Sequence, residues 1–406
     1  MPGAVIHVVG VAIAAVRFVL PGAGCNMTMG RGLRAILLWL AASACWPAQA
    51  EPGVYQNRIV IGQSIGVTGP LSSQALQCAA GAKAYFSEIN AQGGIYDRKI
   101  ELLTRDDGYH VDAALANTEQ LINVERVFAL FGYAGWPGIE ASLPAITKAR
   151  VPFLFPCTGA PSLYGNFKRY VFTMRVGYGH EYRYLLKRFG RFGVKSVALV
   201  YQNNNFGRQL LSALEGQPET RSISLSLIEG DVKGNFPALI RRMMALHPDA
   251  VLLANGDPSI NSAVVRGMHE AGYKGRFFGA SVIGQRALAD KLGPLSRGVI
   301  ITQIVPSPWH VSIPLVSDYR KLMQSSGVTE FSFSSMEGFI AARVFVEALR
   351  RTGRNPTREK LIDALESINE HNFDHRGFPL NFSSTRHDGS DYVDTTVMAG
   401  DAAFIN

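Results

Sequence analysis

Short apolar runs alternate with amphipathic segments along the chain after Asn57, a pattern that predicts a doubly wound α/β sheet. The apolar runs are rich in β-branched residues and are mostly continuous, as expected for parallel strands that helices cover on both faces. The predicted strands are Ile59–Gln63, Lys99–Arg105, Val127–Phe131, Phe153–Phe155, Ser196–Tyr201, Ala250–Leu253 and Gly298–Ile304.

The predicted helices lie between these strands. In the first, Ala75, Ala79, Phe86 and Ile89 recur at three- and four-residue spacing, and Gly93-Gly94 follows as a stop signal. The others are Asp112–Val124, Gly138–Thr147, Glu181–Phe192, Gly207–Gln217, Pro237–Leu246, Ser259–Ala271, Ile313–Ser325, Ser334–Arg351 and Thr357–Ser367.

Residues 1–50 are predicted to be a leader that contains a Sec signal peptide. From Met29 they show a basic region, the apolar stretch Ala35–Ala44 and a small-residue cleavage site at Ala48–Ala50. The start is therefore expected at Met27 or Met29, and the mature protein in the periplasm. The alternatives are a membrane anchor in Ala4–Leu20 and lipid attachment at Cys45.

The charge balance changes little once the leader is set aside. The leader holds three of the 40 basic residues and none of the 32 acidic ones, so 37 basic residues face 32 acidic ones in the remainder. The basic residues are scattered, which argues against nucleic-acid binding. No later apolar stretch approaches the roughly 20 residues that span a bilayer, so a soluble mature protein is expected.

Most motifs for catalysis, metals and cofactors are missing from the sequence. It has no Walker A loop, G-x-G-x-x-G turn, CxxC or HExxH, so neither an enzyme nor a cofactor is expected. Cys78 and Cys157 are the cysteines outside the leader. Export permits a disulfide between them, and two buried free thiols are the equal alternative.

Ligands of such sheets bind beyond the carboxyl ends of the strands, so the loops that follow strands are the candidate site. These loops are rich in glycine, hydroxyl and aromatic residues, and Gly66–Ser73 suits the capture of an anion. Trp136 is predicted either to stack on a ligand or to pack in the core. The candidate ligand-binding residues are Ser72, Gly135, Trp136, Gly138, Cys157, Thr158, Tyr178, Phe206, Asp257 and Ser281.

Several of these segments together resemble the leucine/branched-chain amino-acid-binding family of periplasmic solute receptors, the type I binding proteins of ABC importers. The resemblance covers residues 57–406. The segment Glu88–Ile95, with the Asp106-Asp107 pair that follows, is the most specific part. The supporting segments are Ile59–Ser64, Thr68-Gly69-Pro70, Val151–Ala160, Asn205–Gly207 and His247–Val251.

The resemblance implies two doubly wound parallel-sheet lobes joined by three crossovers, with a solute trapped between them. It places residues 55–175 and 282–384 in the N-terminal lobe and residues 176–281 and 385–406 in the C-terminal lobe. It also implies a monomer that delivers its solute to an inner-membrane ABC permease and its ATPases. A sensory module coupled to a regulator and an exported hydrolase are the competing interpretations.

Two departures from the family pattern bear on the solute. In the family, the loops at Gly135–Gly138 and Cys157–Gly159 hold a carboxylate and the residue at Phe206 covers the ligand, but Trp136 stands where relatives carry Ser or Thr. The acid that pairs with a ligand ammonium falls near the uncharged Ser259, with Asp257 as a substitute. The expected solute is an apolar or aromatic carboxylate, an amide or an amino acid. Because an unpaired buried ammonium is costly, we expect a preference for the carboxylate or the amide over leucine.

Overall fold

The computed structural model describes residues 51–406 except 70, 192, 231–234, 401–403 and 406. The predicted leader, its cleavage site and Cys45 therefore lie outside the described residues. Within the described part, no helix combines the length and the apolar character needed to cross a bilayer. Two separate β-sheets organise the unit Glu51–Asn406.

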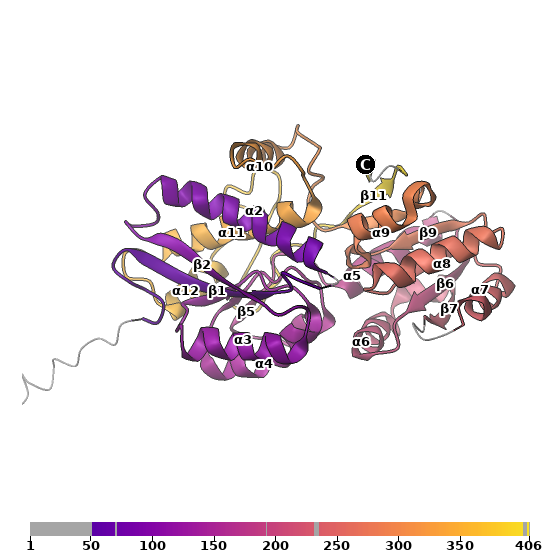
Figure 1. The fold of residues 1–406 in the computed structure, drawn as a ribbon, viewed down its shortest axis with the longest axis horizontal. Coiled ribbons are helices and arrows are strands. Elements are labelled where there is room, and N and C mark those ends of the chain that lie inside the picture. The colour runs from indigo at the N-terminus through magenta and orange to yellow at the C-terminus, as the bar shows by residue number, and fades with distance from the viewer. Residues whose placement is uncertain (1–50, 70, 192, 231–234, 401–403, 406) are drawn as a thin grey trace, which may run out of the picture. The chain divides into compact units, whose positions relative to one another are not determined.

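The first sheet has five parallel strands in the order β2-β1-β3-β4-β5. Helices pack on both of its faces (Figure 1), and each face has its own buried apolar cluster. Its strands are β1 (Arg58–Ile65), β2 (Lys99–Asp106), β3 (Ala129–Phe131), β4 (Phe153–Leu154) and β5 (Val171–Phe172). Its helices are α2 (Ser72–Ala91), α3 (Val111–Asn123), α4 (Trp136–Ala149), α10 (Pro314–Ser325), α11 (Phe333–Arg351) and α12 (Arg358–Glu366). We call this assembly the first lobe.

The second sheet has the order β12-β11-β10-β9-β8-β6-β7 and is parallel from β10 to β7. Only β11 and β12 run antiparallel to their neighbours among its described strands. Its strands are β6 (Ser196–Tyr201), β7 (Ser224–Glu229), β8 (Ala250–Ala254), β9 (Arg276–Gly279), β10 (Ile300–Gln303), β11 (Asp394–Met398) and β12 (Phe404–Ile405). Its helices are α5 (Tyr178–Arg191), α6 (Asn205–Leu214), α7 (Phe236–Ala245), α8 (Pro258–Glu270) and α9 (Gln285–Leu292). This is the second lobe.

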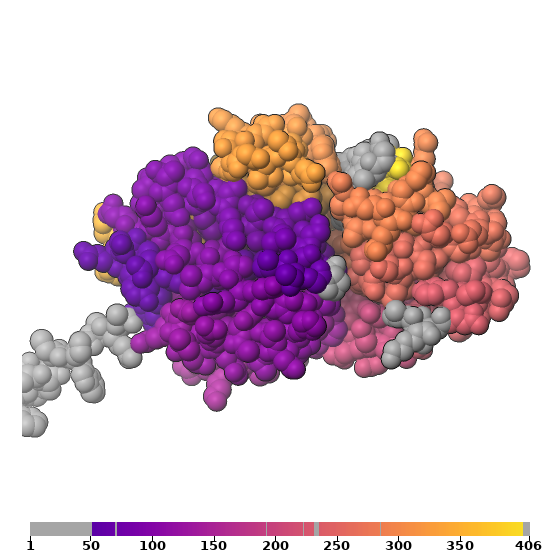
Figure 2. Space-filling model, viewed as in Figure 1, coloured from indigo at the N-terminus to yellow at the C-terminus, as the bar shows by residue number. Residues whose placement is uncertain are grey.

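The chain passes between the two sheets three times, after β5, after β10 and after α12. The two lobes lie side by side and touch in this view (Figure 2). The predicted fold class is therefore confirmed: an α/β fold of two lobes built on parallel sheets.

One element differs from the predicted lobe boundaries. Strand β10 pairs with β9 and β11, so it belongs to the second sheet, whereas the sequence placed residues 282–384 in the first lobe. The preceding helix α9 packs in the core of the second lobe as well. The chain returns to the first lobe only after β10, because this strand completes the parallel part of the second sheet.

The sequence pattern missed five strands, β5, β7, β9, β11 and β12, of which β5 and β12 have two residues each and β7 lies at an edge. Strand β5 has two residues, and β7 is the edge strand of its sheet, with Leu227 exposed and Ile228 buried. An edge strand loses the continuous apolar run of a buried parallel strand, so its pattern resembles a loop.

Two helices of the first lobe cross at a pair of glycines. A Cβ atom at Gly81 of α2 would overlap the backbone of Ser335, and one at Gly338 of α11 would overlap the backbone of Cys78. The absence of side chains at both positions lets the two backbones approach closely. This crossing fixes α2, whose N-terminal end lies at the site described below.

Candidate functional site

A cavity of about 330 Å³ lies between the lobes, and residues from both lobes line it. We call it the solute pocket. Its volume is in the range of small-molecule sites, roughly 300–1,000 Å³. The lining residues are Gly66, Leu71, Gln74, Ala75, Tyr109, Ala134, Gly135, Trp136, Cys157, Thr158, Tyr178, Gln202, Phe206, Gly256, Asp257, Pro258, Ser259, Val282, Ala287 and Lys291.

Most of the residues singled out from the sequence line this pocket. They are Gly135, Trp136, Cys157, Thr158, Tyr178, Phe206 and Asp257. These residues lie in loops that follow strands or in the first turns of helices. Those ends of the elements face the space between the two sheets. Their role in binding stays a prediction.

Three predicted residues do not line the solute pocket. Ser72 begins α2 between two residues that line cavities, and Gly138 packs against Ala114 of α3, where it permits the close approach of the two helices. Ser281 faces a neighbouring cavity, and its hydroxyl is bound within a buried ion-pair network.

The loop Gly66–Ser73 is already engaged with an acid of its own lobe. Asp106 accepts hydrogen bonds from the amides of Val67 (2.9 Å) and Thr68 (3.2 Å) and from the Thr68 hydroxyl (2.8 Å). The amide of Gly108 also donates to Asp106 and is the largest cause of its lowered pKa. These two loop amides are therefore occupied within their own lobe, and the capture of an anion by this loop stays a prediction.

Aromatic rings from both lobes form one wall of the pocket. Trp136 of α4 and Phe206 of α6 lie 5.8 Å apart between ring centroids, and Tyr178 meets Phe206 edge-on at 5.8 Å. Trp136 also packs against the apolar clusters of both lobes. It lines the pocket and contributes to the packing of both lobes, and its stacking on a ligand stays a prediction.

The N-terminal end of α4 opens into the pocket beside Trp136. Its N-cap residue, Gly135, has φ of 97° and no side chain to bind the first helical amides. The ring of Tyr109 lies against Gly135, and a Cβ there would come within 3.2 Å of it. Glycine is thus required at this position both by its conformation and by the neighbouring ring.

Two tyrosines, Tyr109 and Tyr178, stand among the lining residues of the pocket. Tyr178 shares a hydrogen bond of 3.1 Å with the Thr158 hydroxyl, and burial raises the pKa of its phenol. Burial likewise raises the pKa of Tyr109 to about 12, with Tyr178, Asp257 and Asp107 adding to the effect. Both phenols therefore stay protonated at neutral pH and remain hydrogen-bond donors.

Only two charged residues stand among the described lining residues of the solute pocket. Asp257 caps α8, since its Oδ1 accepts the Ser259 amide at 2.7 Å. Lys291 belongs to the last turn of α9, a helix that the sequence pattern did not predict. The pocket otherwise offers aromatic, aliphatic, amide and hydroxyl groups, and the described residues contain no cluster of metal-binding side chains.

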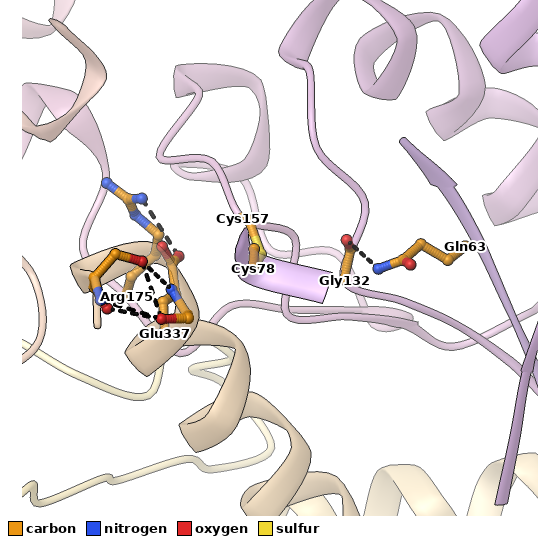
Figure 3. Close-up of a disulfide and its surroundings, with 8 residues drawn as sticks. Gln63, Cys78, Gly132, Cys157, Arg175 and Glu337 are labelled. Carbon is orange, nitrogen blue, oxygen red and sulfur yellow. Dashed lines mark hydrogen bonds and ion pairs between the residues drawn. A yellow bond between two sulfur atoms is a disulfide. The ribbon is translucent and has the colours of Figure 1, made fainter. Parts of the chain in front are cut away.

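A disulfide joins Cys78 of α2 to Cys157 of the loop that follows β4 (Figure 3). Both cysteines are buried, at 2% and 4% exposure. Cys157 lines the solute pocket, so the disulfide fixes this part of its wall against α2. The sequence left open whether these cysteines form a disulfide or stay free thiols, and the structure shows the disulfide.

A buried arginine connects the two lobes behind the pocket. Arg175 contacts Glu181 of α5 at 2.9 Å and Glu337 of α11 at 3.3 Å. The Ser281 amide and the Thr302 hydroxyl donate to the second carboxylate oxygen of Glu181, at 2.8 Å and 2.6 Å. Burial raises the pKa of Glu337, and Arg175 opposes that rise. This network lies where the chain first passes between the lobes, and sequence patterns carried no signal for it.

Direct contacts between helices of the two lobes close another part of the interface. The Glu140 carboxylate of α4 accepts hydrogen bonds from the side-chain amides of Asn205 (3.0 and 3.1 Å) and Gln209 (2.8 Å) of α6. Glu140 follows Trp136 by one helical turn, and both amides flank Phe206 on α6. The rings that line the pocket and the polar contacts thus share one interface between the lobes.

Two lobes on parallel sheets, three connections and a solute-sized cavity between them define a binding protein that encloses its ligand. The family model of the periplasmic binding proteins matches residues 58–399, so the chain belongs to this family of solute-binding proteins. The family resemblance predicted from the sequence is confirmed.

Individual relatives are distant. An "Amino acid binding protein" of Pseudomonas aeruginosa is 25% identical over 301 residues, which cover 70% of this chain and 78% of that protein. The Leu/Ile/Val-binding protein of Escherichia coli is 20% identical over 245 residues, 58% of this chain and 65% of that protein. A branched-chain amino acid ABC transporter protein from Thermus thermophilus with bound valine has the same fold, with a TM-score of 0.76 at 20% identity over 87% of this chain and 96% of that one.

Proposed function

We propose that this chain is a periplasmic solute-binding protein of a branched-chain-amino-acid-type ABC importer. It traps a small apolar or aromatic carboxylate, or an amide, between its lobes and delivers it unaltered to the permease. The observation that carries the proposal is the solute pocket, whose walls come from both lobes and contain four aromatic residues: Tyr109, Trp136, Tyr178 and Phe206. Family membership and the names of the relatives support transport rather than catalysis.

The carboxylate end of the solute is assigned to the N-terminal end of α4. The helix dipole and the free amides after Gly135 favour a negative group there, and the Thr158 hydroxyl lies on the same wall. Its apolar body then lies against Trp136 and Phe206. Aromatic rings in contact with a ring or a branched chain add dispersion and stacking energy to the burial of apolar area.

An amino acid is a poorer fit than a carboxylate or an amide. Asp257 is the single acidic residue among the described lining residues, and one of its oxygens is committed to the cap of α8. A buried ammonium without a full ionic partner loses several kcal/mol relative to water, a cost that a carboxylate or amide solute does not have.

A substitution that keeps the helix cap tests this assignment. Asn caps helices about as well as Asp, so Asp257→Asn removes the charge while α8 keeps its cap. We expect the dissociation constants of phenylacetate and other aromatic carboxylates to change less than about threefold, measured by calorimetric titration. Tight leucine binding by the wild-type protein, abolished in Asp257→Asn, would contradict the proposed solute class.

The same titrations test the proposed mode of action. After saturation, the solute recovered from the protein is expected to be chemically unchanged by mass spectrometry, and small-angle scattering is expected to show a more compact particle. A product in place of the added solute would contradict a transport receptor. We further propose that the protein is a periplasmic monomer, as the predicted leader and the family indicate.

A further inference from the structure

A second cavity adjoins the solute pocket. We call it the side chamber. It has a volume of about 90 Å³, and it shares Leu71, Gln74, Pro258 and Ala287 with the solute pocket. Leu71 and Gln74 belong to the first lobe, and Pro258 and Ala287 belong to the second. The boundary between the two cavities is therefore formed by residues of both lobes.

The side chamber has room for part of a solute. A cavity needs about 10–15 Å³ of such volume to hold one water molecule, so the chamber accommodates a group of several non-hydrogen atoms. Part of its wall is aromatic: Trp309 lies edge-on to Phe333 at 5.6 Å, and Phe331 stands beside them among the lining residues.

The rest of the wall offers neutral hydrogen-bonding groups. Gln74 and Gln77 of α2 project their amides from the same helix face, and Ser73 and Ser334 add hydroxyls. Within the described part of the chain, neither glutamine side chain is engaged in a hydrogen bond to another residue. Both amides are thus available as donors and acceptors for a ligand.

The charges of the chamber favour a neutral group. Its lining contains one base, Arg286, and one acid, Glu330. Arg286 already pairs with Asp290 at 3.0 Å. Glu330 is exposed, so solvent screens its charge, and an amide or a hydroxyl is a better match for the chamber than an ion.

We propose that the natural solute is elongated and bipartite: a carboxylate with an apolar body in the solute pocket, and a neutral amide- or hydroxyl-bearing end that passes Gln74 into the side chamber. This inference rests on the function proposed above. It makes the chamber, and Gln77 in particular, a determinant of solute length. A branched-chain amino acid does not extend past the solute pocket in this arrangement.

Two ligands with the same head group test the inference. Phenylacetate ends at its ring, and 4-acetamidophenylacetate adds a neutral amide of four non-hydrogen atoms at the opposite end. We expect the wild-type protein to bind the longer compound about tenfold more tightly in calorimetric titration, as one well-formed hydrogen bond and new apolar contact would give.

Two variants at neighbouring positions test whether the preference for the longer compound depends on the side chamber. Gln77→Trp fills the chamber and is expected to remove the tenfold preference, whereas phenylacetate binds as before. Leu76→Trp is the matched control, because Leu76 is 44% exposed on the same helix and lines neither cavity. It is expected to keep the preference. Ser334→Leu fills the chamber from α11 and provides a second variant if Gln77→Trp fails to fold.

The outcomes separate the inference from the proposed function. If phenylacetate binds and the longer compound binds no more tightly, the inference is overturned and the proposed function stands. Equal weakening of both ligands by Gln77→Trp and Ser334→Leu also overturns it. If the wild-type protein binds neither compound, the inference and the proposed solute class fail together.

Discussion

Outside the pocket, Arg175 is a buried base that contacts an acid from each lobe. Its guanidinium is 2% exposed and lies between Glu181 of the second lobe and Glu337 of the first (Figure 3). Two acids share one base here in a buried environment. Burial is the main cause of the raised pKa of Glu337, Arg175 opposes it, and the neighbouring Glu181 carboxylate adds to it.

Replacing Arg175 with methionine leaves two buried carboxylates without their cation. We expect Arg175→Met to lower the free energy of unfolding by about 3–5 kcal/mol, because breaking a buried pair from one side strands the opposite charges. Glu337→Gln is the matched variant, since its amide oxygen still accepts from Arg175 and the surplus charge is gone. We expect Glu337→Gln to lower the free energy of unfolding by less than about 2 kcal/mol. Equal losses in denaturant titrations of the two variants would contradict this account.

The same network gives a pH dependence with a defined sign. Burial raises the pKa of Glu337 in the folded state, so the folded protein holds this proton to a higher pH than the unfolded chain does. The contribution of this group to stability is present at low pH and is lost as the pH rises beyond the ordinary glutamate range. The difference in unfolding free energy between the wild type and Glu337→Gln is therefore expected to grow as the pH rises beyond that range.

At the scale of elements, helix α2 organises the first-lobe side of the cleft. It crosses α11 at the Gly81–Gly338 contact, provides Gln74 to the solute pocket and is bonded through Cys78 to the loop after β4. A loop that follows a two-residue strand has little hydrogen-bonded support of its own. The disulfide gives it a fixed position.

Removing the disulfide should therefore affect both stability and binding. The crosslinked cysteines are 79 residues apart, and the chain-entropy model assigns about 4.5 kcal/mol to a loop of this length. We expect the double variant Cys78→Ala, Cys157→Ala to lose most of that amount in denaturant titration and to bind its solute more weakly. A variant with unchanged stability would show that α11 and the β4 loop hold α2 without the crosslink.

At the scale of the whole molecule, the helix pair α4 and α6 joins the two lobes over the pocket. The Glu140 carboxylate accepts three hydrogen bonds from Asn205 and Gln209, next to the ring contact of Trp136 and Phe206. Contacts that form only when the lobes meet stabilise the closed state, and they slow the release of a trapped solute.

Glu140→Ala should weaken closure without touching the pocket wall. We expect about tenfold faster solute dissociation in stopped-flow measurements, with a smaller change in the association rate. Glu119→Ala on α3 is the control, because Glu119 is exposed and lies outside both cavities. If the dissociation rate is unchanged in Glu140→Ala, these three hydrogen bonds contribute nothing to closure.

The amino-acid sequence alone indicated seven of the described strands and every described α-helix except α9, and therefore many of the loops that follow strands. Because parallel strands end at a common edge, Gly135, Trp136 and Thr158 could be assigned to one site from the order of these elements. The periodicity of α2 and the continuous apolar runs of β1 and β6 were equally readable, because burial on one or both faces leaves a regular pattern.

Only the tertiary structure decided which distant segments meet. The pairing of Cys78 with Cys157, the place of Arg175 between two glutamates, and the approach of Tyr109 and Lys291 to the pocket depend on distances in space, and local pattern carries no information about these. Strand β10 joined the second sheet for the same reason, since strand pairing is a long-range contact. The residues that close the cleft are fixed by the packing of one lobe against the other.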